Sequence, residues 1–121
     1  MKIDGTKFGS ITINGQKYGH DVYLDQKGNI EKRNKKISKP YSTGHTVLGP
    51  KEIEYLLAKE PDILVIGKGQ YGVLPIPQES RELLEKANIE IIEDKTPVII
   101  PVLNDLYQKE KNVVAILHTT C

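Results

Sequence analysis

The sequence predicts an α/β fold in which helices flank a mixed or parallel central sheet, with an N-terminal antiparallel β-meander packed against that sheet. Three observations support this fold class. Residues 1–33 contain short alternating runs separated by turn residues, as antiparallel strands do. Two continuous apolar runs, 63–66 and 113–117, are typical of strands covered on both faces, and they place strands at 62–66 and 113–117. Stretches with helical spacing lie between these runs, so the two strands are expected to be parallel neighbours.

Size and charge limit the possible functions. At 121 residues the chain is near the commonest domain size, so a single domain over residues 1–121 is expected. A net charge of +1 gives no overall field that would attract nucleic acid or an anionic membrane. One Phe and no Trp leave few surfaces for stacking single-stranded bases. Without a membrane-length apolar run or a signal-peptide pattern, we expect a cytoplasmic protein with no nucleic-acid and no membrane partner.

The first third of the chain is expected to form the β-meander, over residues 1–33. Residues 10–13 alternate between apolar and polar types before Asn14-Gly15, which is the strongest short hairpin signal. Residues 18–24 would be the return strand of that hairpin. Turn residues at 25–28 then precede a third strand over residues 29–33.

The remainder divides into a loop and an alternation of helices with strands. Residues 34–49 are rich in Lys, Ser, Pro and Gly, which predicts an exposed loop. Over residues 50–121 we expect helices beginning at Pro50, Pro77 and Thr96, with Thr96 as N-cap, and strands at 62–66, 89–92 and 113–117. Pro101 lies one turn inside the third helix, where it removes a backbone donor, so a bend or a reset start is expected there.

A glycine-rich turn follows the first apolar strand. Gly67-Lys68-Gly69-Gln70-Tyr71-Gly72 matches the G-x-G-x-x-G pattern of dinucleotide sites. In such sites a helix begins at the glycines, but Pro75 and Pro77 force the residues before them into extended conformations and displace the helix start. A turn that needs positive φ is therefore favoured, and no cofactor is expected. A weaker variant remains, in which the turn N–H groups and Lys68 hold a small anion.

The C-terminal His118 and Cys121 suggest thiol chemistry, because a thiolate paired with histidine is a strong nucleophile. Two considerations weaken this interpretation. If the strand continued to residue 121, side chains three residues apart would point to opposite faces. The α-carboxylate of Cys121 would also oppose formation of a thiolate. A cysteine with no special role is favoured, and no catalytic residue is assigned.

Two further sets of residues are interpreted as ordinary structure. His20, His45 and His118 share no short ligand spacing, so hydrogen-bonded side chains are favoured over a zinc site and no metal is expected. A run of basic residues could bind phosphate or an acidic protein, but a solvated loop is favoured. The run consists of Lys32, Arg33, Lys35, Lys36 and Lys39.

Motifs along nearly the whole chain resemble those of a known α/β family. They are Phe8-Gly9-Ser10-Ile11 with Tyr18 and Asp21, Gly44-His45, Leu64-Val65-Ile66-Gly67-Lys68-Gly69, Thr96, Asn104 with Leu106, and His118-Thr119-Thr120-Cys121. That family was first described from a methanogen protein of unknown function. It includes the human adipogenesis-associated protein and, distantly, a mitochondrial complex I assembly factor. The resemblance implies a small antiparallel sheet beside a mixed or parallel sheet, no established enzyme activity, and a link to protein assembly.

Ligand sites in parallel sheets lie beyond the carboxyl ends of the strands. We therefore expect one candidate cleft at this end of the sheet. Its expected lining is Gly67, Lys68, Gly69, Gln70, Tyr71, Gly72, His45, His118 and Cys121. The leading hypothesis is a non-enzymatic protein-interaction or assembly module with a protein partner. The alternatives are binding of a small anionic ligand at the glycine turn 67–72, and a thiol-dependent or hydrolytic enzyme that uses Cys121 and His118.

Overall fold

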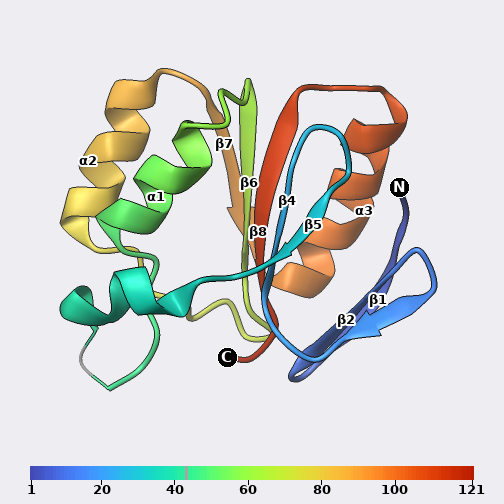
Figure 1. The fold of residues 1–121 in the computed structure, drawn as a ribbon, viewed down its shortest axis with the longest axis horizontal. Helices are drawn as coiled ribbons and strands as arrows, with labels where there is room; N and C mark the ends of the chain where they lie inside the picture. Colours follow the sequence, from blue (N-terminus) through green and yellow to red (C-terminus); the bar gives the residue numbers. More distant parts are fainter. Residues whose placement is uncertain (43) are drawn as a thin grey trace.

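The computed structural model describes residues 1–42 and 44–121. A three-stranded antiparallel sheet contains β1 (Ile3–Lys7), β2 (Ser10–Ile13) and β3 (Gln16–Tyr18). A five-stranded mixed sheet has the order β5-β4-β8-β6-β7, with β4 (Val22–Leu24), β5 (Ile30–Lys32), β6 (Ile63–Lys68), β7 (Glu90–Asp94) and β8 (Val113–His118). The helices are the 3₁₀ helix η1 (Lys35–Tyr41), α1 (Pro50–Leu57), α2 (Gln78–Ala87) and α3 (Thr96–Gln108). This arrangement confirms the expected fold class (Figure 1).

The two apolar runs form the parallel centre of the larger sheet, as predicted. β6 pairs with β8 in parallel from Ile63 opposite Val113 to Lys68 opposite His118. β7 pairs in parallel with the other edge of β6. The register brings the carboxyl ends of β6 and β8 side by side, so the glycine turn after β6 and the C-terminal residues after β8 share one end of the sheet.

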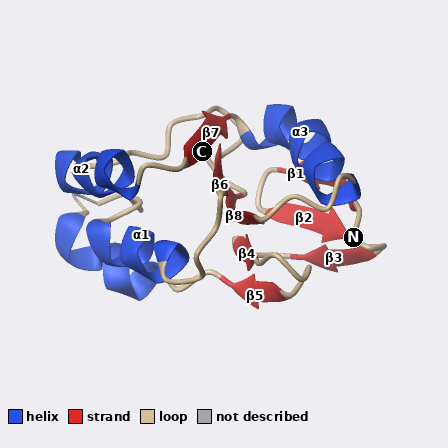
Figure 2. Cartoon of the chain, turned by 90° about the horizontal axis from the view of Figure 1, so that it is seen from above, coloured by secondary structure: helices blue, strands red, loops and turns tan. Residues whose placement is uncertain are grey.

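Both faces of the central strands are buried, which explains why the runs are continuously apolar. On one face the core packs against α1 and α2, and on the other it packs against α3 and the small sheet, as Figure 2 shows. Alternate residues of the same strand serve the two cores: Leu64 and Ile66 face α1 and α2, whereas Val65 belongs to the core beneath α3.

The N-terminal third confirms the hairpin and corrects its extent. Asn14 and Gly15 both adopt positive φ, 51° and 78°, and place Ile13 opposite Gln16. The predicted return strand over residues 18–24 is wrong, because the chain leaves the small sheet after Tyr18. β4 and β5 join the larger sheet, where β4 pairs antiparallel with β8. The meander therefore does not reach residue 33. All three residues of β4 are buried, because Val22 and Leu24 face the core beneath α3 and Tyr23 faces the core beside α1 and α2.

The segment predicted as an exposed loop, 34–49, is partly helical and partly buried. Residues 35–41 form η1, and Ser38, Val47 and Leu48 are buried. The Ser38 hydroxyl accepts a hydrogen bond of 2.9 Å from the N–H of Gly49, which joins this segment to the start of α1. Local composition did not reveal the burial of Ser38, because this side chain is buried through a polar contact.

The helices begin close to the predicted positions. α1 starts at Pro50 as expected, and α2 starts at Gln78, one residue later than expected. α3 continues through Pro101 from Thr96 to Gln108, so the reset start is wrong. Pro101 is on the exposed side of α3, where its ring does not crowd the core. None of the described helices combines the length and apolar character needed to cross a membrane.

Candidate functional site

The glycine turn after β6 binds the C-terminal segment. Gln70 N–H donates to the main-chain oxygen of Thr120 at 2.7 Å, and the N–H groups of Tyr71 and Val73 donate to that of Cys121 at 3.3 and 3.1 Å. Gly69 has φ +97°, and a Cβ built there would lie 2.4 Å from the main-chain carbon of Cys121. These N–H groups are consequently occupied by the protein itself, which removes the donors that the anion hypothesis assigned to the turn.

Thr96 connects the same turn to β8. Its hydroxyl accepts a hydrogen bond from Gly69 N–H at 2.9 Å and donates one of 2.6 Å to the carbonyl oxygen of His118. The expected N-cap role of Thr96 is therefore wrong, since Lys95 occupies the cap position of α3. A Cβ at Gly67 would approach the Thr96 oxygen to 2.8 Å, so this close packing requires glycine.

His118 ends β8 with both ring nitrogens engaged. Nδ1 lies 2.7 Å from Asp21 Oδ2, and Nε2 lies 3.2 Å from the hydroxyl oxygen of Thr120. Asp21 Oδ1 also accepts hydrogen bonds from the N–H and the hydroxyl of Thr119, at 2.8 and 2.9 Å. An ionised carboxylate only accepts hydrogen bonds, so Nδ1 carries a hydrogen, and in the neutral form of the ring Nε2 accepts from the Thr120 hydroxyl. Cys121 is not the partner of this imidazole.

Asp21 is held in its ionised form. Burial raises the pKa of its carboxyl, but hydrogen bonds and charge from His118, the Thr119 N–H and Arg33 outweigh that effect and hold the pKa well below its ordinary value. Arg33 is only 4% exposed and donates to Asp21 Oδ2 at 2.9 Å. Its assignment to a solvated basic run is therefore wrong.

Arg33 joins Asp21 to a second buried carboxylate, Glu52. The guanidinium donates to both Glu52 oxygens, from Nε at 2.8 Å and from Nη2 at 2.7 Å. The Tyr23 hydroxyl donates to Glu52 Oε2 at 2.6 Å, and burial together with this bond raises the Tyr23 pKa. Sequence reasoning missed Glu52, although helical spacing was a usable signal: Glu52 lies four residues before the buried Leu56 and hence on the apolar face of α1.

A cleft of about 510 Å³ opens beside His118. It is lined by Lys35, Gly44, His45, Thr46, Val73, Leu74, Pro75, His118, Thr120 and Cys121. The structure thus brings together three predicted residues, His45, His118 and Cys121. The six turn residues do not line this cleft: Lys68, Tyr71 and Gly72 line a separate surface pocket, where Lys68 Nζ is 3.4 Å from Glu93.

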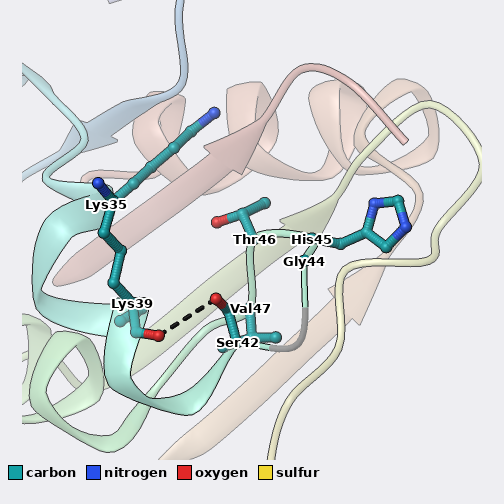
Figure 3. Close-up of a pocket in the computed structure, with 8 residues that line it drawn as sticks. Lys35, Lys39, Ser42, Gly44, His45, Thr46 and Val47 are labelled. Atoms are coloured by element: carbon teal, nitrogen blue, oxygen red, sulfur yellow. Dashed lines mark hydrogen bonds between the residues drawn. The ribbon is translucent and has the colours of Figure 1, made fainter.

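The lining of the cleft combines basic and apolar residues. Lys35 and His45 also line an adjoining pocket of about 190 Å³ above η1, and Figure 3 shows the imidazole of His45 pointing away from Lys35 and Lys39. Val73, Leu74 and Pro75 form the apolar wall. Among residues 1–42 and 44–121, no Asp or Glu side chain lines the cleft. His20 lies elsewhere, with its ring against Tyr18.

Comparison with known proteins identifies relatives without an assigned activity. A family model described as a protein of unknown function (DUF498/DUF598) matches residues 3–118. One relative of known crystal structure is PH1505, a conserved hypothetical protein from Pyrococcus horikoshii. Its sequence is 39% identical to this chain over 100% of both chains, and the two structures have a TM-score of 0.87. The structure of MT938 is 30% identical over 99% of this chain and 98% of its own, with a TM-score of 0.82. No curated protein matches the chain.

One further solved structure shares the fold alone. An outer membrane protein from Bartonella henselae is 22% identical over 98% of this chain and 94% of its own, with a TM-score of 0.70. The cytoplasmic location expected from the sequence stays a prediction.

Proposed function

We propose that this chain, which belongs to the DUF498/DUF598 family of proteins of unknown function, binds a small organic anion in the cleft beyond the carboxyl ends of β6 and β8. The observation behind the proposal is the composition of that cleft, whose lining combines a lysine and two histidines with apolar residues. Its volume of about 510 Å³ is in the range of small-ligand pockets. Its position at the ends of parallel strands is where such sheets commonly bind ligands.

The lining suggests the chemistry of the ligand. Lys35 supplies a positive charge whose side chain is 47% exposed, and it lies 3.9 Å from the already paired Asp21. Val73, Leu74 and Pro75 offer apolar contact in the same cleft. A carboxylate attached to a short apolar chain matches both kinds of lining residue. This site lies beside the glycine turn, and it uses side chains instead of the turn's occupied N–H groups.

Butyrate is a suitable probe, with butyramide as its uncharged analogue. Butyrate is expected to bind more tightly than butyramide when both are titrated and followed by NMR chemical shifts. Lys35→Ala should weaken butyrate binding by about two- to fivefold, which corresponds to loss of one partly exposed ion pair. Lys36→Ala is the matched control, because Lys36 is exposed on the same helix but does not line the cleft. Equal affinities for both probes would contradict the proposal.

A second candidate is protein interaction, which an exposed aromatic patch favours. Phe8 is 60% exposed, Tyr71 is 66% exposed and Val73 is 58% exposed. The rings of Phe8 and Tyr71 lie 6.4 Å apart, so residues from two distant segments form one apolar surface. Exposed groups of large apolar residues are typical of protein-binding surfaces. The assembly role implied by the family resemblance points in the same direction.

Photo-crosslinking tests this second candidate. A benzophenone amino acid is introduced in place of Tyr71 and, as a control, in place of Tyr55, which is 38% exposed and packs beside Tyr23. If the patch contacts a protein, irradiation in cells should yield a discrete protein adduct from position 71 and none from position 55. Adducts of the same pattern from both positions would indicate nonspecific contact and remove this candidate.

A further inference from the structure

We propose that Thr120, His118 and Asp21 form a nucleophile, general base and positioning carboxylate that hydrolyse an ester or thioester of a small carboxylic acid. This inference rests on the proposed function, because the same cleft has to hold the acyl chain. Thr120 and His118 line the cleft, whereas Asp21 lies behind His118 and is 1% exposed. Neither the family description nor the solved relatives name an activity of this kind.

The three side chains lie in the order that acyl transfer requires. The Thr120 oxygen is 3.2 Å from His118 Nε2, and His118 Nδ1 is 2.7 Å from Asp21 Oδ2. Both distances are within about 2.6–3.2 Å, the reach needed between a nucleophile, its base and the group that orients the base. Asp21 also selects the tautomer that the reaction requires: it fixes a hydrogen on Nδ1, so that in the neutral form of the ring Nε2 is free to take the hydroxyl proton.

The surrounding contacts hold this geometry in place. Asp21 accepts hydrogen bonds from Thr119 and Arg33 in addition to His118, so its carboxylate cannot rotate without losing several partners. The main chain of Thr120 is fixed separately, by Gln70 N–H on its carbonyl oxygen. Within the described residues, His118 is the only side chain that hydrogen-bonds the Thr120 hydroxyl. That hydroxyl is therefore not needed to satisfy another buried group.

Access to the nucleophile is consistent with a reaction in the cleft. Thr120 is partly exposed, while His118 is 2% exposed and sits behind it. The apolar wall of Val73, Leu74 and Pro75 would contact the acyl chain. Lys35 lines the same cleft and supplies a positive charge that would stabilise negative charge on the carbonyl oxygen.

The reaction proceeds in two balanced steps. The Thr120 oxygen attacks the carbonyl carbon and transfers its proton to His118 Nε2; the bond to the leaving alcohol or thiol then breaks, and the leaving group takes that proton. Water next attacks the acyl-threonine carbonyl, with its proton passing to His118 and then to the Thr120 oxygen as the acid is released. Water is the only co-reactant, and no oxidant or reductant is required.

The test uses p-nitrophenyl acetate, butyrate and octanoate with three forms of the full chain. The unaltered protein is expected to hydrolyse at least one of these esters and to carry the acyl group on Thr120 in rapidly quenched samples analysed by mass spectrometry. Thr120→Val removes the hydroxyl at nearly constant shape, so hydrolysis should fall about 100-fold or more, to the level of buffer. Thr120→Ser keeps a hydroxyl at the same position and should restore turnover.

A fourth form tests Asp21 as a positioning residue. Asp21→Asn, shown by NMR to be folded, should lower kcat more than it changes KM, because the amide no longer orients the base as the carboxylate does. A merely structural role would instead change stability with kcat unaffected.

Binding and turnover separate the possible failures. Butyrate binding and ester turnover are therefore both measured on the unaltered protein. If the unaltered protein binds butyrate but hydrolyses no ester and carries no acyl group, the triad is overturned and the anion site stands. Hydrolysis that is equal in Thr120→Val also overturns the triad. If butyrate does not bind while Thr120 is acylated, the triad is supported and the proposed anion recognition fails.

Discussion

Arg33→Ala is expected to destabilise the folded protein by about 3–5 kcal/mol, the range found when one partner is removed from a buried ion pair. The guanidinium is buried and bonds to two carboxylates, Asp21 and Glu52, that are themselves buried. Removing it would leave two negative charges in the interior without their shared counter-ion. Urea unfolding followed by circular dichroism measures the change, and the midpoint should move to much lower urea at an unaltered slope.

Lys35→Ala provides the control for this prediction. Lys35 is also a cation near Asp21, at 3.9 Å, but its side chain is 47% exposed. Water screens such a pair, so the expected change in unfolding free energy is below about 1 kcal/mol. If Arg33→Ala and Lys35→Ala changed stability equally, the buried network would not have the role described here.

Gly69→Ala is expected to be the most damaging change in the glycine turn. Its Cβ would meet the main chain of Thr120 and Cys121 at 2.4–2.6 Å, and φ of +97° strains any L side chain. Positive φ and the forced movement together should lower stability by about 2–5 kcal/mol. The shift would also move the segment that presents Thr120 to the cleft, so butyrate binding should weaken in the same variant.

Gly9→Ala separates the two causes. Gly9 has a similar φ of +86°, but nothing lies within 4 Å of the Cβ position. Only the strain of positive φ applies at Gly9. The free energy of unfolding is therefore expected to fall by about 1 kcal/mol, with butyrate binding unchanged. Thermal and urea unfolding of both variants give the comparison. A loss in Gly9→Ala as large as that in Gly69→Ala would show that close packing against residues 120–121 is unimportant.

Local patterns were sufficient to predict parts of the fold. The hairpin at Asn14-Gly15 and the parallel pairing of β6 with β8 follow from turn chemistry and from runs that are apolar on both faces. The move of β4 into the larger sheet was missed, because alternation within 1–33 does not tell which sheet a strand will join. That choice depends on β8, about ninety residues further along the chain.

The site was predictable to a similar degree. The rule that ligands bind at the carboxyl ends of parallel strands predicted His118, Cys121 and His45 around one cleft, and the three residues line the same cleft in the structure. The same rule predicted that N–H groups of the glycine turn would bind an anion. In the structure those N–H groups donate to the main-chain oxygens of residues 120–121. Arg33 was assigned to a solvated run because it stands among lysines in the sequence. Its buried partners Asp21 and Glu52 come from distant segments, so the local sequence did not reveal them.

The three histidines report directly on whether the cleft beside His118 is the ligand site. Titration with butyrate is followed through the imidazole resonances of His20, His45 and His118 in ¹⁵N-labelled protein. His45 and His118 line the cleft and should shift together with one saturation curve, while His20 should stay constant. Constant resonances for His45 and His118 at high butyrate, or an equal shift of all three histidines, would contradict the account.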